Sequence, residues 1–380
     1  MANEFQVSNI IAKEMLPYIS EGNVMTSAKE KNVSRTYEAE WNRTDGLDIG
    51  TEIRLPLPNY HESLDEFEGE TQTSFVKKKT VTLKIEKHFY KQIEINISDE
   101  TFNIKNFMQN QVRPIMDVFA RGIEAYVFNK MKTSCYNYVE LGGANGPTSN
   151  ADAIKLSSKF NKLKVATGSR KLVLTSTAYE NAMGIDSILK ANERGSNEVT
   201  ATGFIADHMG MRYYHSNQLD DVIFEPSNFS GGVLKGALVK DQDNKVVTLD
   251  GCTEGDVITA GSIIKLGTAS IVAKSDATVD AAGEVAIPVE KVGFNVPDNT
   301  EATLAQVGGN FGFSPNAFTL AMVTPAQPAG NVDSSVAVDP ETGATLRVTV
   351  TYDGTHLKNL ATFHVFVGGG LVVPEHAYRF

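Results

Sequence analysis

Cysteine is scarce in this chain: only Cys135 and Cys252 occur in 380 residues, and neither lies near a second cysteine or a histidine cluster. Disulfide frameworks and zinc sites need cysteines at short, paired spacings, so the sequence predicts neither and favours a reduced, cytosolic setting. Long apolar runs are also missing, because no stretch approaches the roughly 18 residues of a membrane-spanning helix. The acidic Glu4 stands where a secretion signal would be basic, so no such signal is expected.

The motifs of common enzyme families are absent as well. The sequence has no phosphate-binding P-loop, no GxGxxG after a strand, no HExxH and no GxSxG. Seven histidines are scattered, and only His208 and His215 are spaced so that a turn would bring them together, a pairing that is usually structural. We therefore assign no catalytic, cofactor-binding or metal-binding residue and expect no cofactor, with an unrecognised hydrolase left open as an alternative.

Acidic residues outnumber basic ones, with 46 aspartates and glutamates against 35 lysines and arginines and a net charge of −11. A dedicated nucleic-acid binder would show a basic stripe, so this class is disfavoured. The charge favours solubility and repulsion between copies. If copies assemble, buried apolar surface or local charge pairing has to overcome that repulsion.

The N-terminal part predicts a projecting architecture. Residues 5–19 predict a short amphipathic helix, and a polar, extended arm follows. In residues 50–60 the apolar residues alternate with Arg54 and prolines, which suits an edge strand, and in residues 80–97 apolar and polar residues alternate strongly. Together they predict a long β-hairpin that lies on another surface, because a lone hairpin is marginal in water. Its acidic tip is solvated or faces a partner and includes Glu62, Asp65, Glu66, Glu68 and Glu70, and the returning strand starts with Lys77, Lys78 and Lys79.

The middle of the chain predicts an α/β unit behind a long helix. Residues 99–134 have the strongest helical periodicity. Pro114 interrupts it, so we expect a kink or a short first helix, with the main rod beginning near Arg113. Residues 151–221 then alternate between helix and strand.

The C-terminal half predicts mostly strands. Residues 232–312 have no helical period, and their short strands separated by Gly, Asp and Asn predict a small β barrel or sandwich inserted into the α/β unit. Residues 345–380 are rich in strands. We predict that the glycines at 368–370 separate two strands and mark a bulge or a close backbone approach, not a phosphate site.

The order of these parts resembles the major capsid (coat) protein of tailed bacteriophages, the Hong Kong-type capsid fold shared with encapsulins. "GTEIRLPLP" is similar to the strand that opens that family's extended loop, and "VTLKIEKHFYKQIEINISDE" to its return strand. "QVRPIMDVFARGIEAYVFNKM" resembles its spine helix, and "GGGLVVPEHAYRF" its closing segment. "EGDVITAGSIIKL" lies in a region that resembles the inserted β domain of short-tailed phage coat proteins.

The resemblance implies an α+β phage major capsid fold with an N-terminal arm, an extended β-hairpin loop, a long spine helix, peripheral and axial domains and an inserted small β-barrel-like domain. It implies a non-enzymatic shell protein of the virion, assembled in the host bacterial cytoplasm from pentamers and hexamers around double-stranded DNA. Scaffolding protein, portal and decoration proteins are the implied partners. The expected parts are the N-terminal helix and arm (1–49), the hairpin loop and peripheral strands (50–98), the spine helix (99–150), the axial domain (151–222 and 313–345), the inserted β domain (223–312) and the C-terminal peripheral strands (346–380).

Within that resemblance, the acidic tip is expected to pair with basic residues of an adjacent subunit. Two other interpretations stay open. An encapsulin-like compartment shares the architecture but holds a protein cargo, and the inserted β domain favours a phage capsid over it. A β-rich phage structural or binding protein would contain little helix, which the periodicity of residues 99–134 disfavours.

Overall fold

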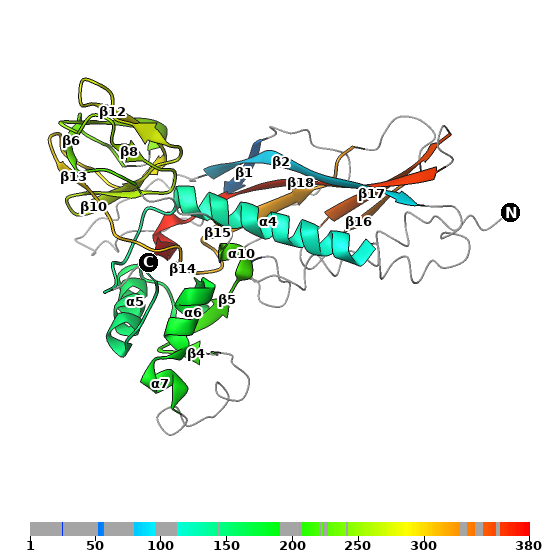
Figure 1. The fold of residues 1–380 in the computed structure, drawn as a ribbon, viewed down its shortest axis with the longest axis horizontal. Helices are drawn as coiled ribbons and strands as arrows, with labels where there is room; N and C mark the ends of the chain where they lie inside the picture. Colours follow the sequence, from blue (N-terminus) through cyan, green and yellow to red (C-terminus); the bar gives the residue numbers. More distant parts are fainter. Residues whose placement is uncertain are drawn as a thin grey trace, which may run out of the picture. The chain divides into compact units, whose positions relative to one another are not determined.

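The computed structural model describes residue 25 and residues 52–56, 80–95, 112–142, 145–190, 205, 207–220, 222, 227–240, 242–326, 333–338, 345–354 and 358–380. The chain is mixed α/β and rich in strands, in agreement with the predicted class (Figure 1). It divides into two compact units. The first includes the described residues of Arg35–Ile115 and Leu320–Val372, and the second those of Met116–Thr319 and Val373–Phe380. The predicted N-terminal helix lies outside the described residues.

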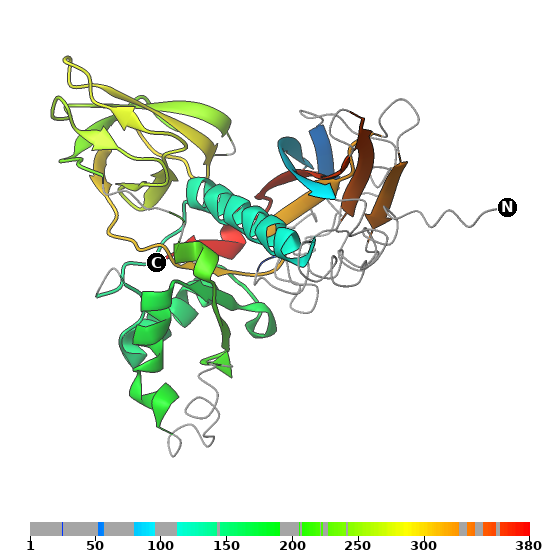
Figure 2. The ribbon, with the colours of Figure 1, turned by 45° about the vertical axis from the view of Figure 1, so that its right-hand side comes forward.

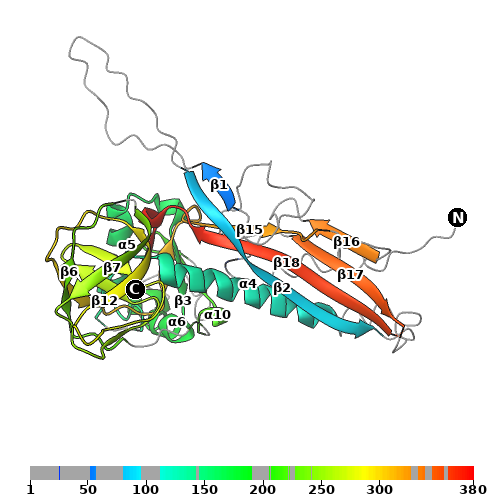
Figure 3. The ribbon, with the colours of Figure 1, turned by 90° about the horizontal axis from the view of Figure 1, so that it is seen from above.

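The first unit contains a six-stranded sheet in the order β1-β2-β18-β17-β16, with β15 also pairing with β18. Its strands are β1 (Glu52–Pro56), β2 (Thr80–Ile95), β15 (Phe318–Val323), β16 (Asp333–Val338), β17 (Thr345–Asp353) and β18 (Lys358–Leu371). The two predicted hairpin strands pair antiparallel, from Glu52 opposite Lys84 to Pro56 opposite Thr80, and the proline-bearing β1 is at the edge as predicted. β2 continues along β18, so the hairpin is anchored on a larger sheet (Figure 3).

Strict alternation gives this sheet two different faces. Phe363, Val365 and Val367 of β18 and Leu346 and Val348 of β17 are fully buried on one face. The residues between them on β17 and β18 are polar or aromatic and belong to the opposite face.

The three glycines at 368–370 lie inside β18, which runs unbroken to Leu371. The prediction that they separate two strands is therefore wrong. The register of β18 against β2 shifts between Val367 and Gly368. A Cβ atom on Gly368 would lie 3.0 Å from the Cα atom of Ile85 and closer still to the carbonyl oxygen of Lys84. The predicted bulge and close backbone approach are confirmed, because the neighbouring strand leaves no room for a side chain.

The long helix α4 (Arg113–Ser134) begins at the residue where the main rod was predicted. Pro114 is tolerated because the first turn of a helix has no internal acceptor for its missing N–H group. Within the second unit, α4 buries Met116, Ala120, Ile123 and Val127 along one stripe. Residues 99–111 of the predicted helix lie outside the part that the structure describes.

The second unit contains a five-stranded sheet in the order β19-β14-β3-β5-β4, in which β3 and β5 run parallel. Side chains from two helices pack on this sheet. Leu156 and Phe160 come from one helix and Ala178 from the other, and they form one core with Tyr213 and Tyr378 of the strands. The predicted alternation of helix and strand is confirmed over the described residues. The elements are α5 (Asn150–Lys162), η3 (Thr167–Ser169), β3 (Lys171–Leu174), α6 (Ser176–Met183), α7 (Asp186–Leu189), β4 (Asp207–His208), β5 (Met211–His215), α10 (Asn217–Asp220), β14 (Phe311–Phe313), η4 (Pro374–His376) and β19 (Ala377–Arg379).

Between α10 and β14 the described residues contain strands and no helix, as the sequence predicted (Figure 2). Six of them make one sheet in the order β10-β9-β13-β6-β7-β12, and β8 pairs with β11. We call this part the β6–β13 module. Its own core contains Leu234, Leu249, Ile264 and Ile287. Its strands are β6 (Gly232–Lys235), β7 (Gln242–Asp250), β8 (Val257–Ile258), β9 (Ile263–Leu266), β10 (Ala269–Val272), β11 (Ala277–Thr278), β12 (Val285–Val292) and β13 (Glu301–Leu304).

Candidate functional site

The charged residues that the sequence singled out for contacts between copies all fall outside the described residues. They are Glu62, Asp65, Glu66, Glu68, Glu70, Lys77, Lys78 and Lys79. Their role stays a prediction. The strands that lead into and out of this segment, β1 and β2, are described and paired.

One serine, one histidine and one aspartate meet where α6 begins. The Ser176 hydroxyl lies 2.9 Å from Nε2 of His215 and donates a hydrogen bond to the Asp220 carboxylate. Asp220 also accepts the backbone N–H of Ser176, at 2.8 Å. The hydroxyl proton is thus directed at Asp220, and His215 donates to the serine oxygen.

A nucleophilic triad needs the opposite arrangement, in which the serine donates to histidine and the carboxylate holds the far side of the imidazole ring. Here the carboxylate binds the serine and the helix start instead. Asp220 satisfies a backbone donor that the first turn of α6 leaves without an internal acceptor. The cluster therefore fastens α10 to α6 and does not form an activated nucleophile.

His208 and His215, which a turn could in principle bring together, are separated. His208 pairs with Met211 at the start of β5, whereas His215 ends that strand. At about 3.4 Å per residue the two lie roughly 13 Å apart along β5. Within the described residues, no three side chains of His, Cys, Asp or Glu gather closely enough to hold a metal ion. None of the helices in that part of the chain is long and apolar enough to cross a membrane.

The β6–β13 module joins the end of α4 through an apolar contact. Tyr136, the second residue after α4, packs with Ile263 and Val272 of the module and is buried. The Phe294 ring meets the Tyr136 ring edge-on at 5.5 Å. The Ser270 hydroxyl donates to the Tyr136 carbonyl oxygen at 2.6 Å, so the contact has a fixed geometry as well as apolar area.

Polar contacts reinforce this joint. Lys265 Nζ lies 2.5 Å from Glu140 Oε1, which also accepts the Gln306 backbone N–H at 3.0 Å. Burial alone would raise the pKa of Glu140, but the hydrogen bonds from Lys265 and Gln306 hold it below its ordinary value. The carboxylate is therefore charged at neutral pH and keeps its partners.

The Arg379 side chain is a third link. Its Nη1 donates to the carbonyl oxygens of Gly261, in the turn between β8 and β9, and of Lys132 in α4. Its backbone pairs with Asn137 and Val139 at 2.9 Å each. Burial lowers the pKa of Arg379 to about 10, so the guanidinium stays charged at neutral pH. One residue thus connects the end of α4, the terminal strand β19 and the module.

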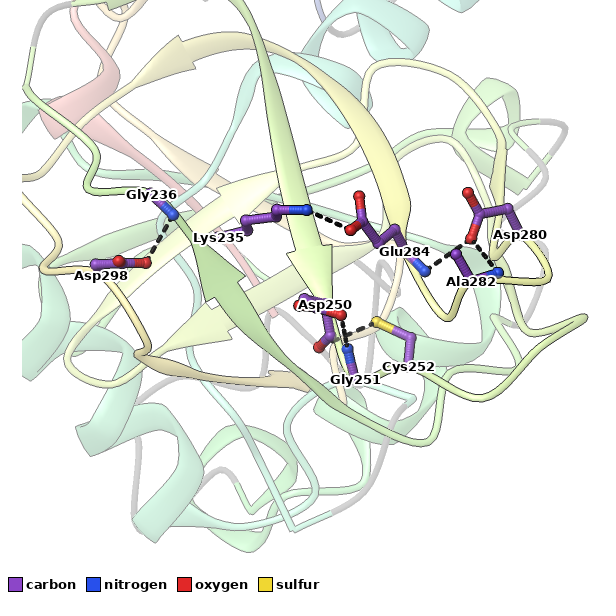
Figure 4. Close-up of polar contacts among 9 residues, drawn as sticks. All are labelled: Lys235, Gly236, Asp250, Gly251, Cys252, Asp280, Ala282, Glu284 and Asp298. Atoms are coloured by element: carbon purple, nitrogen blue, oxygen red, sulfur yellow. Dashed lines mark hydrogen bonds and ion pairs between the residues drawn. The ribbon is translucent and has the colours of Figure 1, made fainter.

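Acidic side chains at the turns of the module have local partners (Figure 4). Asp298 accepts the Gly236 N–H at 2.7 Å, and Asp280 accepts the Ala282 and Glu284 N–H groups at 3.0 and 2.8 Å. Glu284 pairs with Lys235, whose pKa is raised by that hydrogen bond and by the charges of Glu284, Asp250 and Asp280. These acids stabilise turns, so their number alone marks no cation site.

In the first unit, a pair of histidines lies across β2 and β18. Nε2 of His88 and Nδ1 of His364 are 3.2 Å apart, and the edge of the Phe366 ring meets His88 at 4.7 Å. Burial lowers the pKa of both rings, and the charges of His88 and Arg347 lower that of His364 further. At neutral pH both rings are neutral and share one N–H···N hydrogen bond.

Sequence reasoning missed the joint residues Tyr136, Glu140 and Arg379. Their partners lie far along the chain: Arg379 is 118 positions from Gly261, and Ser270 is 134 from Tyr136. A weak local signal exists for Arg379, a single charge in the aromatic sequence AYRF, which favours a buried cation.

No protein-family model matches this chain. No curated protein matches it either. Among solved structures, the chain is similar to Mycobacterium phage Che8, with 12% identity over 94% of this chain and 90% of that one and a TM-score of 0.49. It is similar to the capsid structure of the cyanophage P-SCSP1u, with 10% identity, the same two coverages and a TM-score of 0.44. It is also similar to a virus-like particle from Pyrococcus furiosus, with 9% identity over 98% of this chain and 97% of that one and a TM-score of 0.44. At these identities the likenesses assign no role to any residue.

Proposed function

We propose that this chain is the major capsid protein of a tailed bacteriophage, a shell subunit that assembles with copies of itself around double-stranded DNA. The order of elements carries the proposal. An antiparallel strand pair with a long intervening segment precedes the helix α4, and an α/β sheet follows, interrupted by the β6–β13 module. This is the order that the sequence resemblance to phage capsid proteins implies.

In this function each chain is a structural subunit of the shell and catalyses no reaction. Copies associate around five-fold and six-fold axes, and the contact closes into a shell only if its rotation angle is right. A shell subunit needs a fixed internal geometry to set that angle. The buried joint of Tyr136, Glu140 and Arg379 supports this, because it fastens the module, the end of α4 and the terminal strand together.

We propose that the β6–β13 module is an inserted domain that stabilises the subunit or sets shell curvature. The chain enters it from the α/β sheet at β5 and α10 and returns to the same sheet at β14, which pairs with β3. Deleting residues 225–310 should give misassembled or unstable subunits. If the deletion variant forms normal particles, the module neither stabilises the subunit nor sets shell curvature.

We further propose that the acidic tip formed by residues 62–70 pairs with basic residues of an adjacent subunit. With a net charge of −11, copies repel at long range, so local pairing has to offset the repulsion. Changing Asp65, Glu66 and Glu68 to lysine should weaken assembly most at low salt, where charges are least screened. Unchanged assembly at low and high salt would exclude the pairing.

Scaffolding protein, portal and decoration proteins are the proposed partners, and the host bacterial cytoplasm is the proposed place of assembly. The acidic balance suits a container in which DNA slides without sticking to the wall. Electron microscopy of the protein expressed with and without its scaffold tests the proposal: closed shells support it, and a lone monomer under every condition refutes it.

An encapsulin-like compartment is the second candidate, because the resemblance includes encapsulins. Particle content discriminates between the two: packaged DNA with a portal and tail supports the phage capsid, and a protein cargo supports the compartment. The third candidate, a β-rich binding protein, predicts little helix, and the 22 residues of α4 stand against it.

A further inference from the structure

Two histidines on adjacent strands of the first unit turn ring nitrogens toward each other. Nε2 of His88 on β2 and Nδ1 of His364 on β18 are 3.2 Å apart. In the register of the two strands His364 lies opposite Tyr90 and Phe366 opposite His88, so the histidines are diagonal neighbours on one face of the sheet. The proposed shell function assigns no role to this pair.

Aromatic neighbours fix the orientation of the His88 ring. The edge of the Phe366 ring meets it with the ring centres 4.7 Å apart, and the Tyr90 ring lies 5.8 Å from it, tilted by 43°. The two imidazole rings are 5.3 Å apart and 22° from parallel. Side chains that packing already holds in place lose little freedom when they bind a ligand, so the pair is preorganised.

The distance between the two nitrogens matches the distance that a zinc ion requires. Zinc binds imidazole nitrogen at about 2.0–2.1 Å and prefers tetrahedral geometry, which places two such nitrogens roughly 3.3 Å apart. The observed 3.2 Å is within about 0.1 Å of that value. Two neighbouring ligands of a square-planar ion such as Cu²⁺ would be roughly 2.9 Å apart. The spacing therefore favours Zn²⁺.

Both nitrogens can become ligands without a net loss of protons. A neutral imidazole carries one N–H group, and a ligating nitrogen must carry none. The ring that donates the shared hydrogen bond therefore moves its proton to its other nitrogen when the ion binds. Each ring then keeps one N–H group and directs a lone pair at the ion.

The surroundings of the pair supply the remaining ligands and limit the strength of the site. His88 is exposed, so water can fill the other two positions of a tetrahedral ion. Lys84 and Glu86, which precede it on β2, are exposed and carry opposite charges, so their effects on a cation offset each other. Arg347 lies opposite His364 on β17, and its positive charge opposes a cation. The site is therefore weaker than a closed site of four protein ligands.

We propose that His88 and His364 form a two-histidine site for Zn²⁺, with water as the other ligands. One ligand comes from β2 and the other from β18, so the bound ion joins the two strands. The two residues are 276 positions apart in the sequence, so the unfolded chain does not hold them together. Zinc binding should therefore stabilise the folded first unit.

Zinc chloride added to the isolated full-length chain, after a chelator has removed bound metal, tests the site. Isothermal titration calorimetry should show zinc binding by the unmodified chain, and H88Q and H364Q should each remove it. In urea unfolding followed by far-ultraviolet circular dichroism, zinc at about 100 times its dissociation constant should raise the folding equilibrium constant of the unmodified chain about 100-fold. The same zinc concentration should leave the H88Q curve where it is without zinc. Because His88 is exposed, H88Q should fold without zinc, and its zinc-free curve shows whether it does.

H215Q is the matched control. His215 is also an exposed histidine of a strand, but its Nε2 faces the Ser176 hydroxyl and not a second imidazole. H215Q should keep both the zinc binding and the gain in stability.

Four outcomes refute the site. They are an unmodified chain that binds no zinc, zinc binding that H88Q or H364Q retains in full, zinc binding that H215Q loses as H88Q does, and an unmodified chain that zinc does not stabilise against urea. Shell assembly enters none of these measurements, so they test the zinc site independently of the proposed function.

Discussion

Gly368 is the position at which one added carbon atom should cost most in the first unit. Its φ angle is not in the left-handed region, so alanine is compatible with the backbone dihedrals there. The obstacle is space: a Cβ atom would lie 3.0 Å from the Ile85 Cα atom and closer to the Lys84 carbonyl oxygen, inside the limit that real Cβ atoms respect. Both obstructing atoms are backbone of β2, so no side-chain rotation relieves the clash.

The magnitude follows from two opposing effects. Overpacking costs about 1–3 kcal/mol, and a clash with backbone belongs at the upper end of that range. Replacing glycine by alanine returns about 0.4–1 kcal/mol, because the unfolded chain loses freedom. G368A should therefore reduce the free energy of unfolding of this unit by about 2 kcal/mol. With a urea m-value of about 2 kcal/mol/M, the midpoint should fall by about 1 M.

Urea unfolding followed by far-ultraviolet circular dichroism measures this shift, and Gly370 in the same strand supplies the control. A Cβ atom on Gly370 would meet only the Leu83 Cδ2 atom, at 2.9 Å, and a leucine methyl group moves aside. G370A should cost less than about 1 kcal/mol. If G368A unfolds at the same urea concentration as G370A, β18 does not approach β2 as closely as described, and the explanation of the glycines fails.

Three further outcomes are expected. Y136A should lower the stability of the second unit by about 3–5 kcal/mol, as for a buried aromatic residue, and should increase proteolytic cleavage of the β6–β13 module; unchanged cleavage would mean that Tyr136 does not hold the joint. Folding lowers the pKa of His88 and His364 below the ordinary histidine value of 6.5, so the unfolded chain binds more protons and their stabilising contribution is complete above pH 6.5 and declines below it. H364Q should therefore flatten the loss of urea stability between pH 7.5 and 5.5, and an unchanged slope would contradict this. Burial raises the pKa of Cys135 to about 12, so iodoacetamide should alkylate it only after unfolding, and rapid labelling of the native chain would show that the site is open.

The parts of the fold that were predictable depend on short-range patterns. Pro114 placed the start of α4 because a proline is tolerated only in the first turn. The alternating apolar residues placed β2, and the prolines placed β1 at an edge. The glycines misled the prediction of strand ends. A run of glycines usually interrupts a strand, whereas here β2 lies so close that glycine is what allows β18 to continue.

Polar residues were harder to interpret, because the same pattern serves different roles. In "TLRVTVTY" the alternation shows that Thr345, Arg347 and Thr349 share a face, and in "AYRF" it marks Arg379 as a cation among aromatic residues. Only the three-dimensional partners separate the two cases. Arg379 reaches carbonyl oxygens of Lys132 and Gly261, so its charge joins α4 to the β6–β13 module. Arg347 reaches the Pro325 carbonyl oxygen and the Ser334 hydroxyl, both within the first unit. The same alternating pattern therefore includes one cation that joins parts of the second unit and another that joins strands of the first, and the pattern alone does not distinguish them.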